Sequence, residues 1–269
     1  DIIKPGSIAG HYYSGNQLIH GRRFKSAEKL PALNTEWRSY VQQMLHFIPR
    51  AEDAVVGLEN TGTSFFLKRQ VIFQEDQIFL DHSLSGNIIV VSRQEIEVSA
   101  FANLDQVLLI APKVTFRSGF EGNAHVLSEE TIVEENVRLH YPSSITVLAR
   151  EGEELKPEDV YKPKIIIGQK SIFEGNILFL DSLEDEGHKN DVLLAEDSFV
   201  EGNVYSEGYT ELRGTVSGSI YTRYFVANQA GSLYINHIYN GRVLKASDKK
   251  EITGLILEDS DKKVAAWLY

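Results

Sequence analysis

The feature that most constrains this fold is a strand-and-turn repeat, clearest in residues 191–226. Short aliphatic and β-branched runs, such as Val192-Leu193-Leu194 and Thr215-Val216, are separated every few residues by Gly-Asn, Glu-Gly or Gly-Ser. These dipeptides form turns, and the runs between them are typical of strands. The stretch therefore predicts β structure and indicates no catalytic motif.

A glycine recurs along the chain in one local setting, after an acidic or small residue and before Asn or Ser. Its occurrences are Gly86, Gly122, Gly175, Gly202 and Gly218. When the polar insertions at about 150–164 and 182–191 are removed, the repeat has a period of about 16–19 residues, typical of small units that must stack to bury their apolar faces. A period of this length without a helix predicts a mainly β fold, a single-stranded parallel β-helix (a solenoid), with right-handed coils favoured. Each coil would hold three short strands, with Gly and Asn at the corners.

The chain divides into three predicted parts. Residues 1–53 form an N-terminal region with one amphipathic helix over about 35–48, which packs on or caps the solenoid. The helix is predicted because apolar residues from Trp37 to Ile48 recur at helical spacing after Asn34 or Thr35 as N-cap. Residues 54–250 form the β-helix, and residues 251–269, ending in Trp267-Leu268-Tyr269, form a C-terminal cap.

Composition limits the partners. The net charge of -11 and the isoelectric point near 5.2 argue against nucleic acid and against an anionic membrane surface. The chain contains no cysteine, which excludes disulfides and thiolate metal sites. No apolar run reaches the roughly 18 residues of a membrane span. Because the first residue is Asp1 rather than Met, we expect a processed protein of the cell envelope, periplasmic or on the surface, attached to a membrane only through a segment upstream. A cytoplasmic protein is the alternative.

Part of the repeat resembles a known family. The segments Ser198-Phe199-Val200-Glu201-Gly202-Asn203-Val204 and Thr215-Val216-Ser217-Gly218-Ser219-Ile220 are similar to the repeat of bactofilins, bacterial polymer-forming β-helices. The resemblance covers about residues 165–243 and implies a filament subunit. A second resemblance, to the hexapeptide acyltransferases, rests on Ile167-Gly168-Gln169-Lys170-Ser171-Ile172 followed by Phe173-Glu174-Gly175-Asn176-Ile177, but its six-residue rhythm does not persist beyond these two units.

The chain contains none of the usual catalytic signatures, and its eight histidines are scattered singly. We therefore predict no catalytic residue, cofactor or metal site. One acidic insertion has carboxylates that suit Ca²⁺, although a solvated loop is the favoured interpretation. Its acidic residues are Asp181, Glu184, Asp185, Glu186 and Asp191. Other carboxylates, such as Glu201, accompany turn glycines and are not expected at matched positions of adjacent coils.

Tyrosines are dense near the C-terminal end and are candidates for a protein-binding or glycan-binding surface, because tyrosine combines an apolar ring with a polar tip. They are Tyr205, Tyr209, Tyr221, Tyr224, Tyr234 and Tyr239. Packing within the last coils is the alternative role for these rings.

Two function classes stay open. The favoured one is a non-catalytic structural or interaction module, bacterial, that presents its β surface to a protein or glycan, with self-association into a bactofilin-like filament as a variant. The alternative is a carbohydrate-active enzyme, a polysaccharide lyase or hydrolase, which requires a cluster of carboxylates on successive strands of one face.

Overall fold

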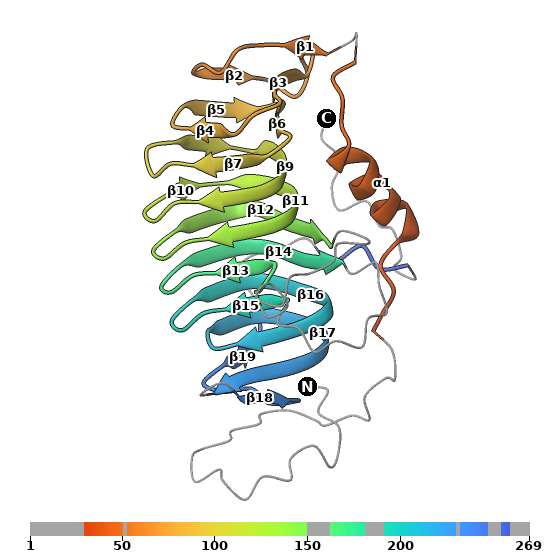
Figure 1. The fold of residues 1–269 in the computed structure, drawn as a ribbon, viewed down its shortest axis with the longest axis vertical. Coiled ribbons are helices and arrows are strands. Elements are labelled where there is room, and N and C mark those ends of the chain that lie inside the picture. The colour runs from red at the N-terminus through yellow and green to blue at the C-terminus, as the bar shows by residue number, and fades with distance from the viewer. Residues whose placement is uncertain are drawn as a thin grey trace, which may run out of the picture. The chain divides into compact units, whose positions relative to one another are not determined.

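The computed structural model describes residues 30–50, 53–149, 162–180, 191–229, 232–246 and 254–258. These residues are mainly β, with one α-helix and strands stacked alongside it (Figure 1). Most of both predicted insertions, much of the N-terminal region and most of the predicted cap lie outside the described residues.

The helix α1 spans Thr35–Leu45. The strands in chain order are β1 Ala54–Val55, β2 Thr61–Thr63, β3 Gln70–Gln74, β4 Ile78–Leu80, β5 Ser83–Gly86, β6 Ile88–Ser92, β7 Glu95–Val98, β8 Asn103–Asp105, β9 Val107–Phe116, β10 Glu121–Gly122, β11 Ala124–Val133, β12 Arg138–Leu148, β13 Ile165–Ile167, β14 Ile172–Leu180, β15 Val192–Leu194, β16 Phe199–Leu212, β17 Thr215–Gln229, β18 Ser232–Ile235 and β19 Arg242–Leu244.

Nearly all neighbouring strands run parallel, and the central pairing closes on itself. Strand β11 pairs with β13, β13 with β15, β15 with β16, β16 with β14, β14 with β12, and β12 again with β11. The core is thus a closed barrel of six parallel strands. The predicted single-stranded β-helix, or solenoid, is wrong.

The reason lies in the length of the strands. Strand β16 has 14 residues and β17 has 15, so neither ends at the glycine that the sequence marks as a corner. One half of β16 pairs with β14 and the other half with β15. Strands that continue through a bend and bond to a different neighbour on each half close the ring.

Glycine permits these bends. Gly175, Gly202 and Gly218 lie in register on β14, β16 and β17, with positive φ angles of 145°, 149° and 151°. Side chains are strongly disfavoured in this backbone region. Because these three glycines are in register, the three adjacent strands bend at the same point along their length.

The core enclosed by the stacked strands, inside the barrel and beyond it, is filled with aliphatic and phenylalanine side chains. Phe116, Phe120, Phe173 and Phe179 are among its largest fully buried members. Alternate residues of each strand point inward, as the buried positions of β13 and β15 show. This burial is the main source of stability.

Helix α1 covers one outer face of the stacked strands. Asn34 caps it, because its side-chain oxygen accepts the Glu36 amide at 2.8 Å. The helix begins where the sequence predicts and ends at Leu45, three residues before Ile48. Val41 is fully buried in a second apolar cluster with residues such as Ile110 and Leu127. A C-terminal segment joins the same side, where Leu257 forms an antiparallel bridge with Leu33.

Another part of the surface carries ion pairs between neighbouring strands. Arg117 bonds to Glu97 and to Glu134, each at 2.6 Å, and Lys113 lies 3.0 Å from Glu95. These acidic and basic groups largely neutralise one another across the strands, which leaves little net charge to attract a partner.

The Arg117 hydrogen bond lowers the pKa of Glu97 below its ordinary value of 4.5. A carboxylate with a depressed pKa stabilises the fold above pH 4.5, and this contribution is lost as the pH falls through the folded-state pKa. We expect Glu97→Gln to lower the Tm by about 2 °C at pH 7 and to weaken the acid-induced loss of stability. Thermal unfolding between pH 3 and 7 measures this, and identical pH profiles for variant and wild type would contradict it.

Candidate functional site

A shallow polar hollow lies on the three-stranded parallel sheet β2–β5–β8. Its volume is about 310 Å³. The residues that line it are Asn60, Thr61, Gly62, Ser83, Leu84, Ser85, Asn103 and Asp105. All but Leu84 are polar or glycine, and Leu84 is buried beneath the surface. The hollow therefore offers hydroxyl, amide and carboxylate groups on three neighbouring strands.

Small residues keep the hollow open. A Cβ atom on Gly62 would lie 2.6 Å from the Ser85 hydroxyl oxygen, so even an alanine would crowd the floor. In the parallel register, Gly62 faces Ser85, and Ser85 faces Asp105. Because outward residues alternate along a strand, Ser83 and Asn103 form a second row beside this one.

Hydrogen bonds fix the margins of the hollow. The Asn60 side-chain oxygen accepts the Ser83 amide at 2.7 Å, and Asn123 donates to the Asp105 carboxylate at 2.9 Å. Within the described ranges, the structure shows no hydrogen bond for the Asn103 side chain or for the Ser83 and Ser85 hydroxyls. Hydrogen-bonded margins thus surround groups that remain able to bond to a ligand.

Exposed phenylalanines stand at both ends of these strands. Phe101 is 88% exposed in the turn that leads into β8, and the Ser99 hydroxyl accepts its amide. Phe65 and Phe66 follow β2, and Phe66 is completely exposed. Since β2, β5 and β8 are parallel, their first residues lie at one end of the sheet and their last residues at the opposite end. Phe101 therefore lies beyond one end of the polar floor, and Phe65 and Phe66 lie beyond the other.

A row of acidic and polar groups continues across the following strands. Glu174 on β14 lies in register with Glu201 on β16, so the expectation that carboxylates avoid matched positions is wrong for this pair. The Glu174 carboxylate accepts the Tyr141 amide at 3.1 Å. The His140 Nε2 atom lies 2.9 Å from Glu121 Oε1, and its Nδ1 atom lies 4.0 Å from Glu174 Oε2. The described residues contain no group of three such side chains arranged to hold a metal.

The six candidate tyrosines occupy different environments. Tyr205 and Tyr209 are buried, and Tyr209 stacks on Tyr224 with ring centroids 5.3 Å apart. Tyr221 packs against the cluster beneath α1. Only Tyr224, Tyr234 and Tyr239 are more than one-third exposed, and the last two follow β17 near the C-terminal end. A continuous surface of all six is not formed, and a binding role for the exposed ones stays a prediction.

Tyr205 has a structural contact. Its hydroxyl donates a hydrogen bond to the Pro31 carbonyl at 2.9 Å, and burial raises its pKa to about 12. We expect Tyr205→Phe to cost about 1 kcal/mol of unfolding free energy, because it leaves that carbonyl without this donor. Chemical denaturation measures the loss. A change below 0.3 kcal/mol would show that water replaces the hydroxyl at about no cost.

The predicted calcium loop can be placed at one residue only. Asp191 is buried, and its carboxylate accepts the Tyr209 amide at 2.8 Å. This residue therefore supports the strand pairing around Tyr209. The remaining acidic positions, Asp181, Glu184, Asp185 and Glu186, lie outside the described residues.

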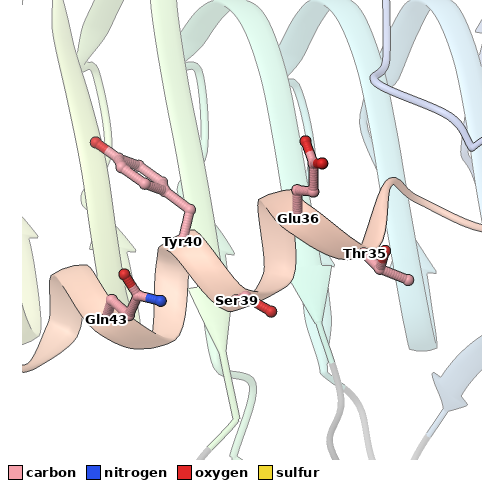
Figure 2. A pocket seen from close by; sticks show the side chains of 5 residues that line it. All are labelled: Thr35, Glu36, Ser39, Tyr40 and Gln43. Atoms are coloured by element: carbon pink, nitrogen blue, oxygen red, sulfur yellow. The ribbon is translucent and has the colours of Figure 1, made fainter.

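A second depression, of about 370 Å³, lies on the outer side of α1. Its described lining comes from this helix alone: Thr35, Glu36, Ser39, Tyr40 and Gln43 (Figure 2). Groups on one face of a single helix do not converge on a ligand from several sides, as a small-molecule site requires.

Within the same described ranges, no helix has the length and apolar character that a membrane crossing requires.

Comparisons with protein-family models, with curated proteins and with solved structures found no match.

The sequence analysis did not predict the hollow, although the sequence contains a signal for it. Ser83-Leu84-Ser85 and Asn103-Leu104-Asp105 each place a buried leucine between two polar residues. Two such triplets in a parallel register predict a polar outer surface over an apolar core.

Proposed function

We propose that this protein is a non-catalytic interaction module that binds a partner through the outer surface of its parallel strands. The observation that carries the proposal is the polar hollow on the separate three-stranded sheet β2–β5–β8, which presents Ser, Asn and Asp side chains from hydrogen-bonded parallel strands. A surface of this kind recognises a partner without a conformational change. The cell envelope is the proposed location, where glycans and other proteins are both accessible partners.

Two other outer surfaces suit this role less well. Helix α1 covers the apolar face, so that face is already occupied. The ion pairs around Arg117 and Lys113 satisfy their charges within the protein. The hollow differs because several of its polar groups make no hydrogen bond among the described residues.

Site-specific photo-crosslinking tests the proposal. A photoreactive amino acid at Asn103 is expected to yield adducts in cells that produce the protein, whereas the same amino acid at Lys113 is expected to yield few. Both positions are on the strand surface, so Lys113 controls for non-specific collision. Equal adduct yields at the two positions would contradict the proposed binding surface.

A polysaccharide hydrolase is the second candidate, favoured by the register of Glu174 with Glu201. Adjacent strands lie about 4.8 Å apart, which brings the two carboxyl groups near the separation that retaining glycosidases use. However, neither depression found in the described residues includes this pair. Incubation with a panel of polysaccharides separates the candidates: new reducing ends that disappear with Glu201→Gln would establish the enzyme.

A further inference from the structure

We propose that the hollow on β2–β5–β8 is a binding site for a neutral glycan, with Phe101 at one end and Phe65 and Phe66 at the other. This inference deepens the proposed function and rests on it.

The floor of the hollow suits sugar hydroxyls. A sugar hydroxyl both donates and accepts hydrogen bonds, so it needs partners of both kinds close together. Asn103 supplies a donor and an acceptor, Asp105 supplies acceptors, and the Ser83 and Ser85 hydroxyls supply either. These groups alternate in two rows on adjacent strands, a spacing that allows one ring to contact several of them.

The dimensions suit a short stretch of polysaccharide. Strand β5 has four residues, which corresponds to a length of about 13 Å. The exposed aromatic residues are not part of the lining itself: Phe101 precedes the start of β8, and Phe65 and Phe66 follow the end of β2. Aromatic rings bury the apolar faces of ligands, and together with a polar floor they define a site of mixed character.

Charge selects neutral glycans over acidic ones. The lining contains the Asp105 carboxylate and no lysine or arginine among the described residues. The whole chain adds a net charge of -11. A uronic acid or a sulfated sugar would be repelled by both, and it would find no cation to pair with.

A protein partner suits this hollow less well. Interfaces between proteins have apolar, fully buried centres. Among the described lining residues Leu84 alone is apolar, and at 1% exposed it cannot form such a centre, whereas the exposed phenylalanines lie beyond the ends of the polar floor. An extended peptide that adds a strand needs an open sheet edge, whereas the hollow lies on the face of the sheet.

Affinity electrophoresis of the purified chain tests the proposal. Native gels would contain soluble neutral polysaccharides (mannan, dextran, xyloglucan, mixed-linkage glucan) or, as the charge control, polygalacturonate and alginate. We expect retardation by at least one neutral polymer and none by the acidic ones. Phe101→Ala and Asn103→Ala are each expected to raise the dissociation constant about tenfold, because one stacking or hydrogen-bonding group is lost.

The matched control is Phe79→Ala, which removes an equally large exposed ring from β4, outside the hollow. It should leave retardation unchanged. Gly62→Ala is a second test, because its Cβ crowds the Ser85 hydroxyl and should weaken binding without removing any ligand contact. Circular dichroism of each variant confirms that it is folded.

Three outcomes would overturn the inference. The first is retardation by no neutral polymer, and the second is retardation by acidic polymers alone. The third is retardation that survives Phe101→Ala and Asn103→Ala but is lost on Tyr234→Ala or Tyr239→Ala. The third would place glycan binding on the tyrosines and keep the proposed interaction function. If the first coincides with selective crosslinking from Asn103 to a protein, the module binds a protein instead.

Discussion

Gly202→Ala is expected to destabilise the protein by about 4 kcal/mol or more, a large share of the roughly 5–15 kcal/mol that stabilises an ordinary domain. Gly202 has a φ angle of +149°, and an added Cβ would lie 1.8 Å from the Gly175 carbonyl oxygen. That oxygen belongs to the backbone of the next strand and cannot rotate away. The substitution therefore forces β14 and β16 apart at the bend.

Thermal and urea unfolding of Gly202→Ala measure this effect, with Gly57→Ala as the matched control. A Cβ on Gly57 has no atom within 4 Å, and its φ angle is not positive. The control should therefore change the free energy of unfolding by less than about 0.5 kcal/mol. A Gly202→Ala protein as stable as the control would show that the bend does not depend on glycine.

The glycine pattern predicted part of this arrangement and misled at another point. Gly175, Gly202 and Gly218 share one local sequence, and they do stack in register. Gly122 has the same neighbours in sequence, yet it pairs with Leu139, and Leu139 pairs with Phe173, two residues before Gly175. The local sequence indicates the backbone conformation that each glycine allows. Which residue it faces on the neighbouring strand depends on the strand register.

Strand length explains why the sequence predicted an open coil. Gly-Asn dipeptides normally end strands, so three short strands per turn were expected. In Gly202-Asn203, however, the extended backbone continues on both sides, and Asn203 donates a hydrogen bond to Asn176 on the next strand at 3.0 Å. Asparagines stacked in this way stabilise a bend within a strand. Pairing between distant strands determines the closure, and a local pattern does not contain it.

The candidate site shows the same division between local and long-range information. Each polar triplet of the hollow can be identified in the sequence. Their assembly depends on the parallel register of β2, β5 and β8. The tyrosines are close in sequence, which favours a shared surface, but alternation along a strand and packing beneath α1 bury two of them.

Val41→Asp is expected to detach helix α1 from the strands and to destabilise the protein by about 3–5 kcal/mol. Val41 is fully buried, and its neighbours in the cluster are apolar. A carboxylate there would have no partner in the cluster to offset its loss of water. The helix would have to leave, which would expose side chains such as Ile110, Leu127 and Leu178 on the strands beneath it.

Exposure of the apolar strand face beneath α1 distinguishes detachment of the helix from unfolding of the whole protein. Detachment of α1 should leave the core enclosed by the strands folded, because that core is a separate cluster built around residues such as Phe116 and Phe173. We therefore expect retained β-type circular dichroism together with dye binding to the apolar face, faster proteolysis near α1 and self-association on size-exclusion chromatography.

Ser39→Asp provides the control, because it adds the same charge to the same helix on its exposed side (Figure 2). It should change stability by less than about 0.5 kcal/mol and leave the protein's elution volume unchanged. If Val41→Asp instead abolishes all β structure, the helix is part of one cooperative unit with the barrel. If it stays monomeric and resists protease, the helix does not protect that face, and the apolar strands beneath it tolerate water.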